Sequence, residues 1–148
     1  MIKGDFSESL NQIRKPAHYR FVSMDREQLY DFCLNQPETT HEYPFGPDLA
    51  VFKVAGKVFA IVTDRNDLCF NVKCDPDVAL TLRGTYDSVT AMSVWPKHWN
   101  YVKAHTGEIS DNELSNWIED SFDLVVDKLP KTAKLRIQGQ VRGQNSNE

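Results

Sequence analysis

Long apolar runs are absent from this sequence of 148 residues, and none approaches the ~20 apolar residues that a membrane-spanning helix requires. The first eleven residues also lack the apolar core of a secretory signal. Cysteine is scarce, and the odd number of three (Cys33, Cys69 and Cys74) argues against a disulfide framework and suits a reducing compartment. We therefore expect a cytoplasmic protein with no membrane partner.

Catalytic motifs are absent too. The sequence has no glycine-rich phosphate loop, no G-x-S-x-G and no H-E-x-x-H. Cys69 and Cys74 are too far apart for a zinc pair and have no further ligands at the usual spacing. General acid–base chemistry by His98 with Asp75 has no supporting spacing. We therefore expect a protein that is not an enzyme, with no cofactor and no metal.

Charge is unevenly distributed along the chain. Residues 1–22 carry a net charge of +2, residues 23–130 carry −9 and residues 131–148 carry +3, for a total of −4. An acidic centre opposes non-specific binding to duplex nucleic acid, because phosphate contacts need a basic surface. Any contact with nucleic acid would need a local basic patch or the basic ends of the chain.

The apolar fraction of 41% and the chain length predict one globular domain with its own core. We place this domain at residues 23–131. Residues 1–22 are polar, with weak periodicity, and are expected to form an N-terminal extension. Residues 132–148 are basic and rich in glutamine and asparagine, and are expected to be largely disordered.

Three apolar runs at the centre of the chain predict an antiparallel meander. They span residues 49–54, 58–63 and 68–73, and the turns between them are Ala55-Gly56 and residues 64–67. Aromatic and β-branched residues fill the runs, as is typical of strands that pack on a core.

Two-residue alternation then assigns side chains to faces of the sheet. If the first turn has two residues and the second has four, Phe52 lies opposite Phe59, and Ile61 lies opposite Phe70. The predicted core face carries Phe52, Phe59, Ile61, Phe70 and Val72. The opposite face carries Lys53, Asn71 and Lys73. This second face is either an ordinary solvated surface or a binding surface.

Flanking segments complete an α+β fold with an antiparallel sheet of five or six strands. Additional strands are expected near residues 41–45, 89–94 and 99–102. Helices are expected near residues 25–35, 76–84 and 110–129, with Asp25, Asp75 and Ser110 as N-caps and Gly84 ending the second helix. The acidic outer face of the last helix is expected to be solvated.

The stretch Trp95-Pro96-Lys97-His98-Trp99-Asn100 has the most unusual composition in the chain. It combines a cation, an imidazole and two indole rings around a proline. In one interpretation Trp99 belongs to the core and His98 makes a local hydrogen bond. In the other, the loop binds an anion or a nucleobase.

Several short motifs together resemble the MmcQ/YjbR family over about residues 24–131. They are Tyr43-Pro44-Phe45-Gly46-Pro47-Asp48, Val51–Val54 with Gly56-Lys57, Val72–Pro76, Lys97–Asn100, Asp123–Val125 and Lys128–Lys131. The chain departs from the family pattern in its long N-terminal extension and at Ala91-Met92, where members often have a glycine-containing turn. The resemblance implies a YjbR-like double-wing fold with helices packed on an antiparallel sheet, and a DNA-binding function that rests on fold analogy.

The motif residues that the resemblance carries over are Lys53, Lys73, Lys97, His98 and Trp99, to which Asn71 is added from the shared strand face. Two functions remain open for these residues. In the first, which the resemblance favours, the lysine-bearing face contacts DNA phosphate. In the second, a non-enzymatic module binds a small anion or an acidic protein partner. Duplex binding should weaken steeply with salt, whereas binding of a small anion should weaken less.

Overall fold

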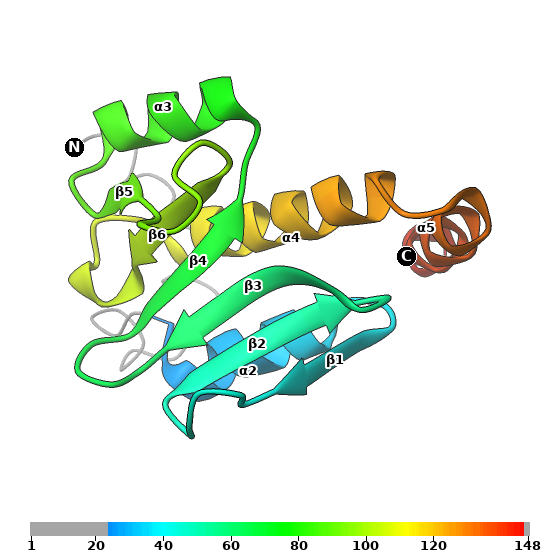
Figure 1. Cartoon of the computed structure of the whole chain (residues 1–148), viewed down its shortest axis with the longest axis horizontal. Coiled ribbons are helices and arrows are strands. Elements are labelled where there is room, and N and C mark those ends of the chain that lie inside the picture. The colour runs from blue at the N-terminus through cyan, green and yellow to red at the C-terminus, as the bar shows by residue number, and fades with distance from the viewer. Residues whose placement is uncertain (1–23, 147–148) are drawn as a thin grey trace.

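The computed structural model describes residues 24–146 and, within them, the side chains of residues 24–140. Six antiparallel strands form one sheet in the order β1-β2-β3-β4-β6-β5 (Figure 1). The strands are β1 (Thr39–Glu42), β2 (Leu49–Val54), β3 (Lys57–Thr63), β4 (Cys69–Lys73), β5 (Val89–Ala91) and β6 (Trp99–Lys103). The predicted α+β class is therefore confirmed, with a first strand that begins earlier and a fifth that is shorter than expected.

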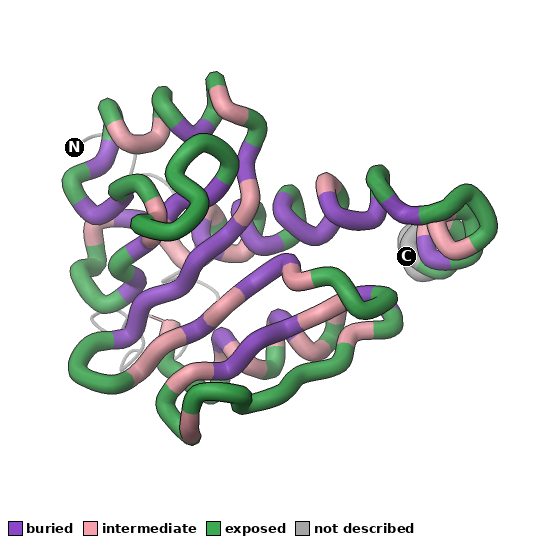
Figure 2. Tube along the Cα trace, viewed as in Figure 1, coloured by how far each residue is buried: buried purple, intermediate pink, exposed green. Residues whose placement is uncertain are grey.

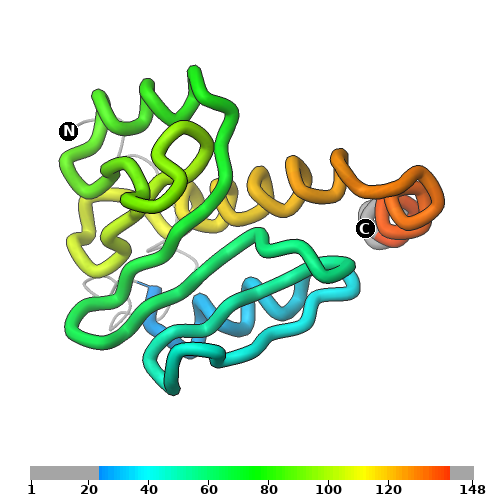
Figure 3. The backbone as a smooth tube through the Cα atoms, in the orientation of Figure 1, coloured from blue at the N-terminus to red at the C-terminus, as the bar shows by residue number. Residues whose placement is uncertain are grey.

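Helices pack on the sheet within the described part of the chain. They are α2 (Arg26–Leu34), α3 (Pro76–Thr85), α4 (Asp111–Asp127) and α5 (Lys131–Ser146), with a short 3-10 helix, η2 (Ala104–Thr106). In Figure 1, α2 and α4 lie behind the sheet, and α3 lies beside β5 and β6. The tube in Figure 3 follows the meander from β1 to β4 before the chain turns into α3.

The helix starts follow from local capping chemistry. Asp25 and Gln28 form a complete capping box at α2, and the Ser110 hydroxyl accepts a hydrogen bond from the Glu113 amide at α4. Asp75 occupies the N-cap position of α3 without a side-chain bond, so there Pro76 at the first helical position provides the start signal. The prediction that Gly84 ends α3 was wrong, because the helix continues to Thr85.

A bulge in β3 shifts the predicted register by one residue. Phe52 pairs with Ala60 and Lys53 pairs with Val58, which leaves Phe59 as an extra residue. Phe59 and Ala60 are both buried. After the bulge, Ile61 pairs with Asn71, so Ile61 lies on the opposite face and its placement in the core was wrong.

The core lies between the sheet and the helices, where Figure 2 shows the buried parts of the trace. The Phe59 and Phe122 rings meet edge to face, with centroids 5.2 Å apart. Beside them the buried Ser121 hydroxyl donates to the Phe59 carbonyl at 2.6 Å and accepts from the Lys73 amide at 2.8 Å. Helix α4 is therefore joined to two neighbouring strands at the bulge.

Residues 131–146 form a helix, so the prediction of disorder was wrong for this part of the C-terminal segment. Ile137 of α5 is fully buried in the core. Nε and Nη2 of Arg136 each donate to the Glu38 carboxylate at 2.8 Å, and Gln140 donates to the same group. Burial and these hydrogen bonds order a segment whose composition is typical of a disordered tail.

The predicted N-terminal extension, residues 1–22, lies outside the described residues. Within residues 24–146, no helix has the length and apolar character needed to cross a membrane.

Ile137→Ala should lower the free energy of unfolding by about 2–5 kcal/mol, because it empties a buried site between α5 and the core. The control is Leu135→Ala on the same helix, whose side chain is 57% exposed and whose removal should change stability by no more than about 0.5 kcal/mol. Urea unfolding of both variants is the measurement. Equal effects would mean that α5 does not pack through Ile137.

The Glu38–Arg136 pair should make stability depend on acid pH. Hydrogen bonds from Arg136 and then Gln140 lower the pKa of Glu38 from 4.5 to about 2. Because the folded pKa is depressed, the stabilisation is present above about pH 4.5 and is lost as the pH falls towards 2. Urea unfolding across this range should show a smaller pH dependence for Glu38→Gln than for the unmodified chain. Identical curves would contradict the contribution of this pair.

Candidate anion-binding site

A cavity of about 490 Å³ lies at one end of the sheet, where three strands begin or end. The antiparallel register brings them together: Val58 lies near the start of β3, Lys73 ends β4 and pairs with Trp99, which starts β6. The remaining lining residues come from the turn after β4, from the loop before β6 and from the end of α4: Cys74, Asp75, Trp95, His98, Leu124 and Lys128.

The cavity is lined by two lysines and a histidine, with one carboxylate. Within the described part of the chain, neither Lys73 nor Lys128 has a carboxylate oxygen within 4 Å. Lys128 is the C-cap of α4, where the negative end of the helix dipole favours a cation. Asp75, at the start of α3, is the carboxylate among the lining residues. The lining therefore has more cationic than acidic side chains, which favours a small anion.

The loop between β5 and β6 adds aromatic surface to these charges. Trp95 is 51% exposed, whereas Trp99 is buried, and their ring centroids lie 5.9 Å apart at 45°. Arg83 of α3 fixes this loop: its Nε donates to Asn100 Oδ1 at 2.7 Å, and its terminal nitrogen donates to the Pro96 and Trp99 carbonyls. Trp95 is thus held at the cavity with much of its ring accessible.

Two further bonds connect the loop to its surroundings. The His98 carbonyl accepts from the Cys74 amide at 2.7 Å, which closes the loop against the end of β4. Asn100 is fully buried, and its Nδ2 donates to the Ala79 carbonyl of α3 at 3.4 Å. Burial raises the pKa of the Cys74 thiol to about 11, so this thiol stays protonated at neutral pH.

The structure brings together half of the residues proposed from the sequence. Lys73, His98 and Trp99 line the cavity. Lys53 lies on the same sheet face as Lys73 but pairs with Glu42 of β1 at 2.6 Å, so an internal carboxylate neutralises it.

The other two proposed residues also lie away from the cavity lining. Asn71 is buried at the centre of β4, between Ile61 and Tyr101 of the neighbouring strands. Lys97 is exposed on the turn before β6.

Sequence reasoning missed Lys128, Arg83 and Asn100. Lys128 is one residue beyond α4, and only the packing of α4 across the sheet brings it near Lys73. Arg83 and Asn100 are 17 residues apart, and no motif joins them. Asn100 lies inside a predicted strand, where an amide was a partial signal, since an amide that becomes buried needs partners.

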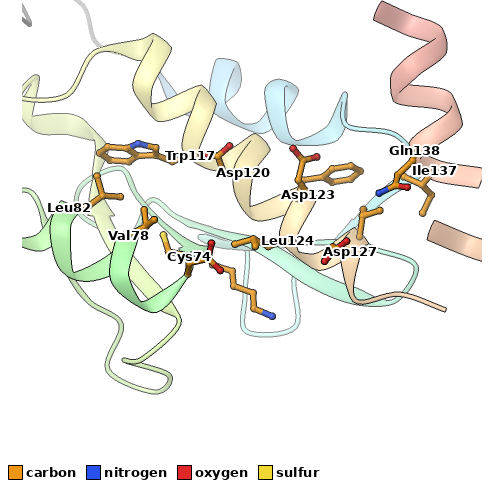
Figure 4. A pocket seen from close by; sticks show the side chains of 14 residues that line it. Cys74, Val78, Leu82, Trp117, Asp120, Asp123, Leu124, Asp127, Ile137 and Gln138 are labelled. Carbon is orange, nitrogen blue, oxygen red and sulfur yellow. The ribbon is translucent and has the colours of Figure 1, made fainter. Parts of the chain in front are cut away.

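A second, larger hollow adjoins the first and shares Lys73, Cys74, Asp75 and Leu124 with it. We call this second hollow the acidic groove. It has a volume of about 720 Å³ and runs along α4 between α3 and α5 (Figure 4). Four aspartates and one lysine line it: Asp75, Asp120, Asp123, Asp127 and Lys73. The acidic face of α4 was predicted to be a solvated surface, and Asp120, Asp123 and Asp127 are indeed exposed, although they also border this groove.

Fold and site together define a small α+β domain with a cationic, aromatic cavity at one end of its antiparallel sheet. The YjbR family model matches residues 34–124, and the chain belongs to this family. The uncharacterised protein YbdF of Escherichia coli O157:H7 is 34% identical over 122 residues, which is 78% of this chain and 98% of YbdF.

Solved structures similar to this chain include proteins of Deinococcus radiodurans and Pseudomonas syringae. The Deinococcus radiodurans protein DR2400, described as a DUF419 domain, has a TM-score of 0.71 at 22% identity over 78% of this chain and 89% of its own. A Pseudomonas syringae protein has a TM-score of 0.60 at 26% identity over 68% of this chain and 98% of its own. At 22% identity, the likeness to DR2400 supports the fold alone.

Arg83→Ala should loosen the Trp95 loop and destabilise the protein by about 1–3 kcal/mol, because it leaves the buried Asn100 oxygen without its charged partner. Amide hydrogen exchange at Trp99 should accelerate. The matched control is Arg65→Ala, which removes an exposed arginine from the turn between β3 and β4. Unchanged exchange in Arg83→Ala would mean that Arg83 does not hold the loop.

Proposed function

We propose that this YjbR-family protein is a non-enzymatic module that binds single-stranded nucleic acid at the cavity of Lys73 and Lys128. The observation that carries the proposal is the combination of two lysines without ion-pair partners among the described residues and a half-exposed indole, Trp95, around one small cavity. Lysine ammonium groups attract phosphate, and an accessible indole can stack on an unpaired base.

The charge around the cavity favours a short, local contact over a long duplex. The acidic groove adjoins the cavity through Lys73 and Asp75, and residues 23–130 carry a net charge of −9. A duplex lying across this surface would bring phosphates close to carboxylates, which repel them. A single strand is more flexible than a duplex, so it can place a phosphate and a base at the cavity while its other phosphates turn away from the carboxylates.

A free nucleotide or another small anion is the second candidate. The cavity volume of about 490 Å³ lies in the range typical of small-molecule sites and supports this candidate. The same residues would bind the phosphate and the ring, so the two candidates differ in how strongly binding depends on salt and on ligand length.

Lys73→Ala with Lys128→Ala should weaken binding of a labelled oligothymidylate and lower its salt slope by about 0.7 for each phosphate that the variant no longer neutralises. The matched control is Lys53→Ala with Lys57→Ala, which removes the same charge but not from the cavity. Trp95→Ala should cost about 1–3 kcal/mol of binding free energy if a base stacks there. Fluorescence anisotropy across a salt series is the measurement, with the oligonucleotide, a duplex of the same length and a nucleoside monophosphate as ligands.

The outcomes separate the candidates. Oligonucleotide binding that disappears in the cavity variant and persists in the control supports the proposal. Equal weakening in both double variants would indicate a general charge effect and overturn the site. If the monophosphate binds as tightly as the oligonucleotide, the small-anion function replaces nucleic-acid binding.

A further inference from the structure

The acidic groove has an apolar interior bordered by carboxylates (Figure 4). The accessible apolar lining comes from α3 and α4 and includes Val78, Leu82 and Leu124, next to the buried Trp117 and Ile137. Four aspartates against one lysine give the lining a formal net charge of −3. A groove with this chemistry suits a peptide segment that has apolar side chains on one side and cations beside them.

The carboxylates of the groove are only partly neutralised. Asp127 pairs with Lys134 of α5 at 2.8 Å. Within residues 24–140, neither Asp120 nor Asp123 has a cationic side-chain atom within 4 Å. Burial raises the pKa of Asp120, and burial and then the Asp120 charge raise the pKa of Asp123. A cation beside these two carboxylates would offset the effects of burial on both and the repulsion of Asp123 by Asp120.

Such a segment exists in the chain itself, outside the described residues. Apolar residues recur at intervals of four, four and three, at Ile2, Phe6, Leu10 and Ile13. Within a segment whose overall periodicity is weak, this spacing is typical of residues that share one face of a helix. Residues 2–15 carry Lys3, Arg14 and Lys15 against Asp5 and Glu8, a net charge of +1. The sequence therefore complements the groove in both polarity and charge.

The described chain begins close enough to the groove for this segment to reach it. The Met24 amide donates to Asp111 Oδ1 at 3.1 Å, at the first residue of α4. Trp117 is six residues further along the same helix, or ~9 Å at 1.5 Å per residue, and Asp127 is ~24 Å from Asp111. The ten residues between Ile13 and Met24 can span ~30 Å when extended.

We propose that residues 2–15 occupy the acidic groove of their own chain, with the four apolar side chains on its interior and the cations beside Asp120, Asp123 and Asp127.

The test uses the full chain with Ser9→Cys carrying a nitroxide spin label. The native thiols are buried, and burial raises the pKa values of Cys33, Cys69 and Cys74, so the label goes to the introduced thiol. In a nitrogen-15 correlation spectrum, the amide signals of Leu82, Trp117 and Leu124 should lose most of their intensity relative to a spectrum recorded after the label has been reduced.

The matched pair of variants tests the charge contribution. Asp120→Asn with Asp123→Asn should restore much of the intensity. Asp31→Asn with Asp48→Asn removes the same charge from exposed positions outside the groove and should restore none. Undisturbed chemical shifts elsewhere would show that each variant is folded.

Three results would overturn the proposal. The first is no loss of intensity at the groove in the singly labelled chain. The second is broadening that also appears when spin-labelled chain is mixed with unlabelled nitrogen-15 chain, since the occupant would then be a second copy. The third is equal recovery in both double variants, since the interaction would then depend on overall charge and not on the groove.

Discussion

The candidate site depends on one hydroxyl group, that of Ser121, which bonds two neighbouring strands at once. It donates to the Phe59 carbonyl and accepts from the Lys73 amide, two backbone groups beside the bulge in β3. Leaving such buried groups unpaired would cost about 1–3 kcal/mol each. The bonds fix α4 over the end of β4. Leu124 and Lys128 follow Ser121 by three and seven residues, so they lie on the same helical face and reach the cavity.

Opposite charges are separated over a short distance in this molecule. The cavity and the acidic groove share Lys73 and Asp75, yet one has a surplus of cations and the other of carboxylates. Helix α4 produces this separation, because its aspartates occupy the groove face and Lys128 follows its C-terminus. A ligand that spans both hollows would therefore need both signs of charge, whereas a phosphate is attracted to one and repelled by the other.

The sequence predicted part of the site for a clear physical reason. Side chains alternate along a strand, so Lys53 and Lys73 were placed correctly on one face despite the shifted register. Their different environments were not predictable, because they depend on neighbours from distant elements. Glu42 reaches Lys53 through the pairing of β1 with β2, and Lys128 reaches the cavity of Lys73 through the packing of α4.

The sequence by itself determined the elements up to α4, their order and most of their ends, because capping residues, turn residues and apolar periodicity act over a few positions. Tertiary structure decided the bulge at Phe59, the cavity and the helix α5. The polar sequence of α5 gives little reason for a stable helix on its own. Burial of Ile137 and the Arg136 bonds to Glu38 join this helix to residues far along the chain. Short helices in proteins owe most of their stability to such packing, which local sequence patterns do not contain.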